Sequence, residues 1–291
     1  MKHLLAICWE MPPLSGPRAV QVTRLLAALA PLGWSSRVVC FAPESNRYQQ
    51  DHLVDVEAMS GGMVTRIGVR SPEEWFAVRV LWRLAPPLKH LPDEKIVWWP
   101  WAVEETRRLI TQQRPDVIVS FAQPWTNHLV GLQMHRESGI PWVAHFSDPW
   151  IDSPYQSHAG WFTGTRARME AAVIREATAI VFVNDETRAC VMRKYEDAAR
   201  ARTTVVPQGH AGGTELEPRR HGPLRLVYAG RFYDQIRTPN TVIAAVDSLA
   251  ARMPLDGLLE VDFLGAGMRR YEDDVRRRGL SHLVRFPGRH T

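Results

Sequence analysis

The chain has 291 residues, of which 45% are hydrophobic and 23% charged, and its formal net charge is +5. This composition is that of a soluble globular protein with room for two domains, and no apolar run approaches the roughly 20 residues of a membrane span. The three cysteines, Cys8, Cys40 and Cys190, are too few and too scattered for a disulfide framework, which favours a reducing, cytoplasmic location.

The positive charge comes almost entirely from arginine, which binds phosphate through a planar, bidentate fork. The sequence has neither a zinc-finger spacing nor a basic run interleaved with aromatic residues, so we expect no nucleic-acid partner. A charge of this size permits peripheral contact with an anionic membrane surface, such as the inner face of a cell membrane.

Apolar strands alternate with helical patterns along the chain, which is typical of an α/β fold with parallel sheets. The first strand is expected at Leu4–Trp9, a helix follows from Pro17, and Gly33 ends that helix before a strand at Arg37–Ala42. The segment 74–101 has no regular pattern. Further strands are expected at 116–121, 142–146, 179–183 and 203–206, with helices at 126–137, 166–177 and 186–195.

The composition changes between residues 207 and 223, where glycine, proline and polar residues predict an interdomain linker. A new unit then begins, with strands expected at 224–229, 259–264 and 283–286 and helices at 239–251 and about 269–278. The sequence therefore predicts a first domain at 1–206, a linker at 207–223 and a second domain at 224–291. Three strands are few for a nucleotide-binding domain, so we expect the second domain to be incomplete.

The first candidate site is the loop before the helix at Pro17. Ligands of open α/β sheets bind beyond the carboxyl ends of the strands, where helix N-termini favour phosphate. Ser15 and Gly16 lie at such a junction, and Gly16 lets the backbone approach a ligand closely. An ordinary tight turn would have the same residues.

The second candidate site follows the strand at 142–146. His145 and Ser147 share one face of the strand because side chains alternate, and Asp148 lies at its end. The Asp148 carboxylate is placed to bind sugar hydroxyls or to orient an acceptor. The alternative is that Asp148 caps a turn before Pro149 and that His145 is a core histidine with its hydrogen bonds satisfied.

The third candidate site is the turn after the strand at 224–229, where Arg231 and Arg237 precede a helix that begins near Pro239. Two guanidinium groups at a helix N-terminus can hold a diphosphate through charge-assisted hydrogen bonds. A solvated turn with two arginines is the alternative. No two aspartates are separated by one residue and no histidines have a metal-ligand spacing, so we expect no metal site.

Taken in order, these segments resemble the retaining glycosyltransferases of the GT-B fold, in particular family 4. The resemblance rests on Met11–Gly16, Arg114–Ile118, Gly139–Val143, Asp148–Trp150, Val205–Gly209 and Gly230–Arg231 with Arg237–Pro239. It implies two Rossmann-like domains that bind a nucleotide-diphosphate sugar between them. It also implies transfer of the sugar, with retention, to a glycan or lipid-linked acceptor, without a metal ion or other cofactor.

The resemblance also implies roles for the candidate residues. Ser15 and Gly16 would bind the diphosphate together with Arg231 and Arg237, which would stabilise the leaving group in place of a metal ion. His145, Ser147 and Asp148 would form the catalytic segment. Many relatives have histidine where Ser147 stands and lysine where Arg237 stands.

Two other functions are compatible with the sequence. The paired-glutamate motif of the family is expected beyond Thr291, so the chain is expected to end inside the second domain. A non-catalytic module that binds a glycan or a partner is therefore one alternative. A nucleotide-sugar epimerase of the same fold is the other.

Overall fold

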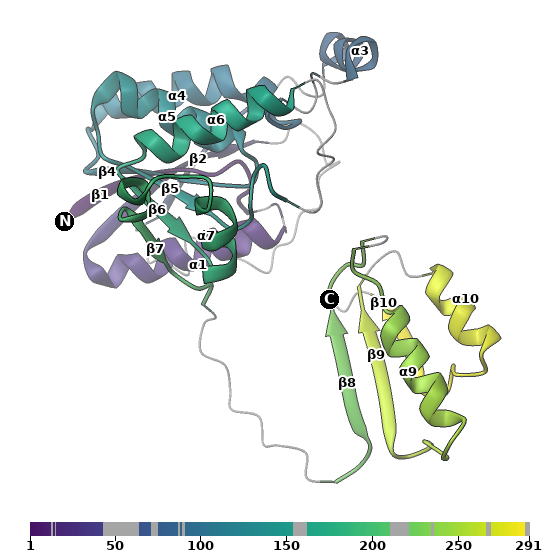
Figure 1. Cartoon of the computed structure of the whole chain (residues 1–291). Coiled ribbons are helices and arrows are strands. Elements are labelled where there is room, and N and C mark those ends of the chain that lie inside the picture. The colour runs from purple at the N-terminus through teal and green to yellow at the C-terminus, as the bar shows by residue number, and fades with distance from the viewer. Residues whose placement is uncertain are drawn as a thin grey trace. The chain divides into compact units, whose positions relative to one another are not determined.

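The computed structural model describes residues 1–12, 14, 16–42, 64–70, 75–86, 88, 91–153, 162–209, 221–233, 236–265 and 269–288. The chain forms two compact units, Met1–Gly213 and Thr214–Thr291, and the division lies within the segment predicted as a linker (Figure 1). No helix within the described ranges is long and apolar enough to cross a membrane.

The described residues of the first unit form a seven-stranded parallel sheet in the order β3, β2, β1, β4, β5, β6, β7. The strands are β1 (Lys2–Ile7), β2 (Trp34–Phe41), β3 (Val64–Val69), β4 (Val117–Phe121), β5 (Trp142–Phe146), β6 (Ala179–Phe182) and β7 (Thr203–Val205). The chain proceeds outward from β1 to β3 and then returns to β4 on the other side of β1. The strand order therefore reverses between β1 and β4, the kind of position where open α/β sheets bind ligands.

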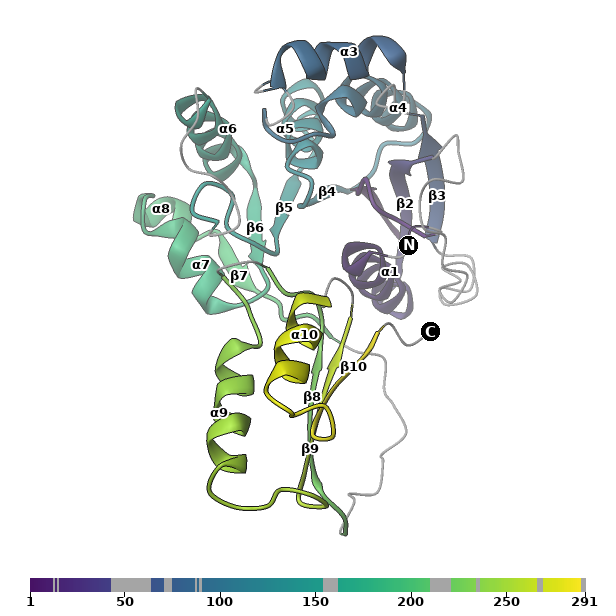
Figure 2. The same ribbon diagram turned by 90° about the vertical axis from the view of Figure 1, so that its right-hand side faces the viewer.

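Helices cover both faces of this sheet. They are α1 (Pro17–Leu29), α4 (Trp99–Gln112), α5 (Thr126–Ser138), α6 (Thr163–Glu176), α7 (Asp185–Met192) and α8 (Asp197–Arg200). A further helix of this unit, α3 (Phe76–Leu84), has no buried residue. Figures 1 and 2 show α4, α5 and α6 on one face and α1 on the other. Because side chains alternate along a strand, Leu5 and Ile7 of β1 pack in the core cluster that contains residues of α4 and α5, whereas Leu4 and Ala6 pack in the cluster that contains residues of α1.

Most predicted elements are present with ends shifted by a few residues, but α3, α4, α8 and β3 were missed. Helix α3 and the beginning of α4 lie in the segment 74–101, where no regular pattern was expected. In α4 the apolar residues are interleaved with charged ones, so its helical period is hard to recognise. In β3 the buried Val64 and Val69 flank four residues that are not buried, because β3 is an edge strand. Cys8 and Cys40 are buried, as expected of small apolar side chains.

The described part of the second unit is a three-stranded parallel sheet in the order β10, β9, β8 with two helices. The elements are β8 (Leu224–Ala229), α9 (Asn240–Ala250), β9 (Leu259–Leu264), α10 (Arg269–Arg277) and β10 (Val284–Gly288). Val246 of α9 and Val275 of α10 belong to one core cluster with Val261 and Phe263 of β9. Both helices therefore pack on the same face of this sheet.

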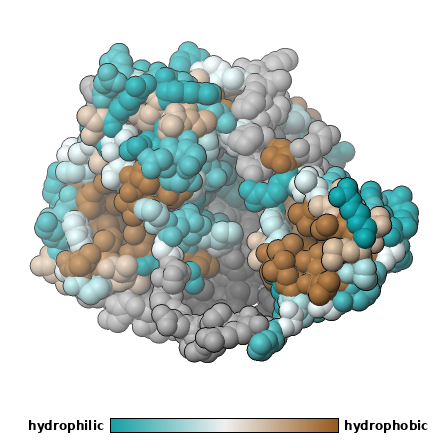
Figure 3. Space-filling model, turned by 60° about the horizontal axis from the view of Figure 1, so that its bottom comes forward, coloured by the Kyte–Doolittle hydropathy of each residue, from teal (hydrophilic) through white to brown (hydrophobic). Residues whose placement is uncertain are grey.

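The opposite face of the second sheet carries charged groups. Asp262 is buried and accepts hydrogen bonds from Arg225 at 2.9 Å and from Arg285 at 2.8 Å. Val227 of β8, which lies on this face beside Asp262, is 57% exposed, and Figure 3 shows brown, apolar surface gathered on this unit. Parallel sheets usually bury both faces, so β8 exposes apolar surface that α/β domains normally cover.

Candidate functional site

Three polar side chains meet where β5 ends and α1 begins. Arg18 donates a hydrogen bond from Nη2 to Ser147 Oγ, and Ser147 Oγ donates one to Asp148 Oδ2 at 2.6 Å. Arg18 stands in the first turn of α1 and crosses to β5, where it is only 8% exposed. The structure therefore brings the predicted residues Ser147 and Asp148 together and adds Arg18, which the sequence did not reveal.

The Arg18 guanidinium has unused hydrogen-bonding capacity. Its Nε and Nη1 groups are buried and have no hydrogen-bond partner among the described residues. Burial lowers the pKa of Arg18, and the neighbouring Cys8, Asp148 and Glu10 act in the opposite direction. A cation that is buried beside carboxylates and keeps unpaired N–H groups is suited to bind an additional oxygen acceptor.

His145 of β5 is paired in register with Phe121 of the neighbouring strand β4. The two rings contact each other with centroids 5.1 Å apart, and His145 Nδ1 is buried without a hydrogen-bond partner in the described part of the chain. His145 is thus not the satisfied core histidine of the alternative interpretation. Burial, with a further contribution from Arg18, lowers the pKa of His145 to about 4, so the imidazole is neutral at pH 7.

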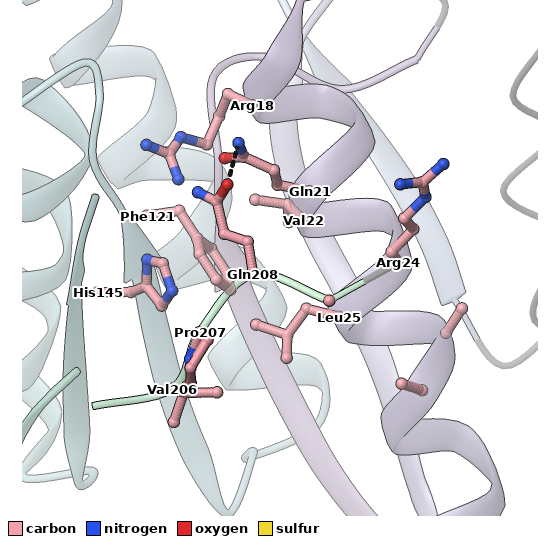
Figure 4. A pocket seen from close by; sticks show the side chains of 13 residues that line it. Arg18, Gln21, Val22, Arg24, Leu25, Phe121, His145, Val206, Pro207 and Gln208 are labelled. Carbon is pink, nitrogen blue, oxygen red and sulfur yellow. Dashed lines mark hydrogen bonds between the residues drawn. The ribbon is translucent and has the colours of Figure 1, made fainter. Parts of the chain in front are cut away.

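Arg18 and His145 both line a cavity of about 450 Å³ within the first unit. Figure 4 shows Arg18 extending from the start of α1 toward β5, and His145 pointing from β5 toward α1. A hydrogen bond of 2.7 Å from Gln21 to Gln208 links α1 to the segment after β7. The remaining lining side chains are largely apolar and include Val22, Leu25, Ala28, Phe121 and Val206.

The predicted loop at the start of α1 is described in part. Gly16 is the N-cap residue of α1, whereas Ser15 lies outside the described residues. The Glu10 carboxylate accepts a hydrogen bond from the Gly16 N–H, and a Cβ atom on Gly16 would lie 1.3 Å from Glu10 Oε1. A side chain at position 16 would therefore displace the Glu10 carboxylate. Any diphosphate bound to Gly16 has to displace the Glu10 side chain.

Residues beyond Asp148 are held by aromatic stacking and by a buried carboxylate. Trp150 stacks on Trp125 with ring centroids 4.9 Å apart. Glu170 is fully buried, and its Oε2 accepts the Ile151 N–H at 2.9 Å. Its Oε1 accepts hydrogen bonds from Lys194 and Tyr195, each at 2.7 Å. These contacts fix the backbone three residues after Asp148.

Replacing Glu170 with glutamine should destabilise the protein by about 2–3 kcal/mol, because the buried amide nitrogen cannot accept the hydrogen bonds that one carboxylate oxygen accepts now. The matched control is Glu176→Gln on the same helix. Glu176 pairs at the surface with Arg136, so its loss should cost at most about 1 kcal/mol. Urea denaturation of both variants measures the difference. Equal losses of stability would contradict the assigned role of Glu170.

Two buried histidines make stability depend on pH. Burial lowers the pKa of His128 to about 3, and His145 titrates at about 4, both below the ordinary value of 6.5. Between pH 6.5 and 5 the unfolded chain therefore binds protons that the folded protein does not. Stability should fall by about 1.4 kcal/mol per pH unit for each histidine as the pH decreases. Thermal unfolding against pH tests this, and His145→Gln should remove about half of the slope; an unchanged slope would contradict it.

The third predicted site belongs to the second unit. Arg231 and Arg237 are exposed in the turn between β8 and α9, where the sequence placed them. Tyr233 and Arg237 pair across this turn, and the Tyr228 hydroxyl donates a hydrogen bond to the Arg231 carbonyl at 3.0 Å. The turn is thus organised by its own backbone. Binding of phosphate by the two arginines remains a prediction.

Comparison with known proteins provides independent information. A family model described as a glycosyl transferase 4-like domain matches residues 18–209. No curated protein matches the chain. Among solved structures, TarM has a TM-score of 0.67 and 8% identity, with 100% of this chain and 77% of TarM covered. A variant of TarM from S. aureus has been crystallised with fondaparinux, alpha-GlcNAc-glycerol and UDP.

Two further structures represent different activities. Sucrose-phosphate synthase from Thermosynechococcus elongatus has a TM-score of 0.64 and 18% identity, with 100% of this chain and 71% of the synthase covered. A protein from Listeria monocytogenes described as a UDP-N-acetylglucosamine 2-epimerase has a TM-score of 0.51 and 11% identity, with 98% and 68% covered. At these identities the likeness concerns the fold, which is the predicted GT-B arrangement of parallel α/β sheets. Since the family model matches more than half of its residues, the chain belongs to the glycosyl transferase 4-like domain family.

Proposed function

We propose that the protein transfers a sugar from a nucleotide-diphosphate sugar to a glycan or lipid-linked acceptor, with retention of configuration and without a metal ion. The observation that carries this proposal is the chain of hydrogen bonds from Arg18 through Ser147 to Asp148 at the carboxyl end of β5. It stands within the segment 18–209 that matches the family model. Open α/β sheets bind their ligands at this edge.

In this proposal the bond between the anomeric carbon and the diphosphate breaks, the oxygen of the acceptor hydroxyl bonds to the anomeric carbon on the same face of the sugar, and the hydroxyl proton passes to the leaving diphosphate. Asp148 would accept hydrogen bonds from sugar or acceptor hydroxyls, and Ser147 holds its carboxylate. His145, being neutral, can exchange a hydrogen bond with an acceptor hydroxyl. Arg231 and Arg237 would stabilise the charge of the leaving diphosphate.

The donor part of the proposal can be tested by thermal unfolding in the presence of UDP and GDP. A ligand that binds only the folded protein raises its Tm, and we expect a rise of a few degrees with one nucleotide. Arg231→Ala should abolish this rise. Arg252→Ala is the matched control, since Arg252 is an exposed arginine that follows the other end of α9.

Two results would contradict donor binding by the second unit. One is the absence of a shift with either nucleotide. The other is an equal loss of the shift in Arg231→Ala and Arg252→Ala, because a general effect of positive charge would then explain the binding.

We further propose that the reaction takes place in the cytoplasm, with peripheral contact between the protein and the inner membrane face.

An epimerase is the second candidate function, and the likeness to the Listeria protein favours it. An epimerase changes the configuration of the sugar in the absence of any acceptor. Incubation of the protein with a nucleotide sugar alone, followed by proton NMR, therefore separates the two functions. A new epimeric nucleotide sugar would support the epimerase and contradict sugar transfer as the main activity.

A further inference from the structure

The guanidinium of Arg18 is the most unusual polar group of the first unit. It is more than nine-tenths buried, yet Nε and Nη1 have no acceptor among the described residues. Buried N–H groups are nearly always paired in folded proteins, and each exception requires an explanation. The single side-chain bond to Ser147 uses Nη2 and leaves these two nitrogens available. An unfilled ligand position explains them.

A second unpaired group faces the same space. His145 is 7% exposed, and its Nδ1 has no partner within the described ranges. Arg18 comes from α1 and His145 from β5, so the two groups approach the cavity from opposite sides (Figure 4). Polar groups that converge from different elements on one cavity are typical of ligand sites.

Most of the remaining cavity wall is apolar, and Gln21, Arg24 and Gln208 are its other polar residues. Val22 and Leu25 lie on the same side of α1 as Arg18, while Phe121 and Val206 line the cavity from β4 and from the end of β7. The volume of about 450 Å³ is within the range of small-molecule sites. A ligand that fills it therefore meets the buried charge of Arg18 and a wall that is mainly hydrocarbon.

We propose that this cavity binds an oxyanion, a phosphate or carboxylate group carried on an apolar body, with Arg18 as the charged donor and His145 as its hydrogen-bonding neighbour. The inference rests on the proposed sugar transfer, for which such a ligand would be the acceptor. The same chemistry is present in the donor diphosphate, which is the other source of an oxyanion. Glu10 and Asp148 lie close enough to act on the charge of Arg18, so the anion has to approach through Nε and Nη1.

The test is isothermal titration of the whole chain with octyl phosphate below its micelle concentration, beside octyl glucoside as the neutral match. We expect octyl phosphate to bind at least about tenfold more tightly than octyl glucoside, since charge-assisted bonds are about twice as strong as neutral ones. Arg18→Gln should weaken the binding of octyl phosphate by about tenfold or more. The exposed Arg83 of α3, which does not line the cavity, is the matched control, and Arg83→Gln should change Kd by less than about threefold.

Two further measurements keep the result interpretable. Arg18→Lys retains the charge but not the planar fork, so it should give an intermediate affinity, even if Arg18→Gln proves too unstable to titrate. Leu25→Ala should weaken the binding of octyl phosphate and leave the binding of UDP unchanged if the ligand is an apolar acceptor. If the binding of UDP depends on Arg18 and the binding of octyl phosphate does not, the oxyanion is the diphosphate of the donor.

The proposal is overturned if the binding of neither octyl phosphate nor UDP depends on Arg18, or if Arg83→Gln weakens binding as much as Arg18→Gln. Binding is measured here without any sugar transfer. A protein that binds octyl phosphate through Arg18 but consumes no nucleotide sugar would therefore refute the proposed activity and keep the oxyanion site. A protein that transfers sugar although its ligand binding does not depend on Arg18 would refute the oxyanion site and keep the proposed activity.

Discussion

Asp148→Asn should lower the rate of sugar transfer by two to four powers of ten, the range typical for removal of a positioned acid or base group. Asparagine has nearly the same shape and can still accept the hydrogen bond from Ser147. It lacks the negative charge that acts on Arg18 and that would bind sugar or acceptor hydroxyls. The rate can be measured as release of the nucleoside diphosphate from the donor, at saturating donor concentration.

The control for this variant is Asp185→Asn at the start of α7. The Asp185 side chain is 70% exposed and pairs with Arg188 on its own helix, so the rate should stay within about threefold of the parent. Both variants should unfold at nearly the parent temperature. A rate for Asp148→Asn above about a tenth of the parent rate would exclude a catalytic role for this carboxylate.

Gly131→Ala should destabilise the protein by about 3 kcal/mol, although alanine is the better helix former. A Cβ atom at Gly131 would lie 2.4 Å from Trp142 Nε1 and 3.0 Å from Ser120 Oγ. Trp142 is fully buried and donates a hydrogen bond of 2.8 Å to Ser120, so its ring cannot move aside without breaking that bond. Denaturant unfolding followed by tryptophan fluorescence measures the loss.

Gly164→Ala in α6 is the matched comparison. A Cβ atom at Gly164 meets no other atom within 4 Å, so this change should be neutral or stabilising by up to about 1 kcal/mol. The difference between the two variants isolates the close approach of α5 to β5 from helix propensity. Equal stability of the two glycine variants would contradict the close packing of α5 against Trp142.

The sequence predicted the parallel sheets because their strands are continuous apolar runs. The limits of β8 and β9 are those expected, since both strands stand between clear turns. Helix α4 was missed because its buried side has only Ala102, Val103, Thr106 and Leu109, of which Thr106 is polar. The predictable part of the fold is thus the part in which burial alone determines the residue pattern.

The candidate site could be predicted only where its residues are neighbours in the sequence. Ser147 and Asp148 were found because they come directly after a strand. Arg18 was missed, as its role depends on a long side chain that crosses from α1 to β5, between residues 129 positions apart. Glu10 was missed for a similar reason, because a carboxylate at the N-terminus of α1 is visible only once the loop has folded back. Its partner Gly16 was recognised from the loop alone.

The most direct test of sugar transfer is proton NMR of the protein mixed with UDP- and GDP-sugars, with octyl phosphate and octyl glucoside as acceptors. We expect one donor to be consumed and a new anomeric signal to appear with the configuration of the donor, and we expect Asp148→Asn to suppress both changes. Unchanged spectra for every donor, from a protein whose Tm rises with the matching nucleotide, would contradict the proposed activity.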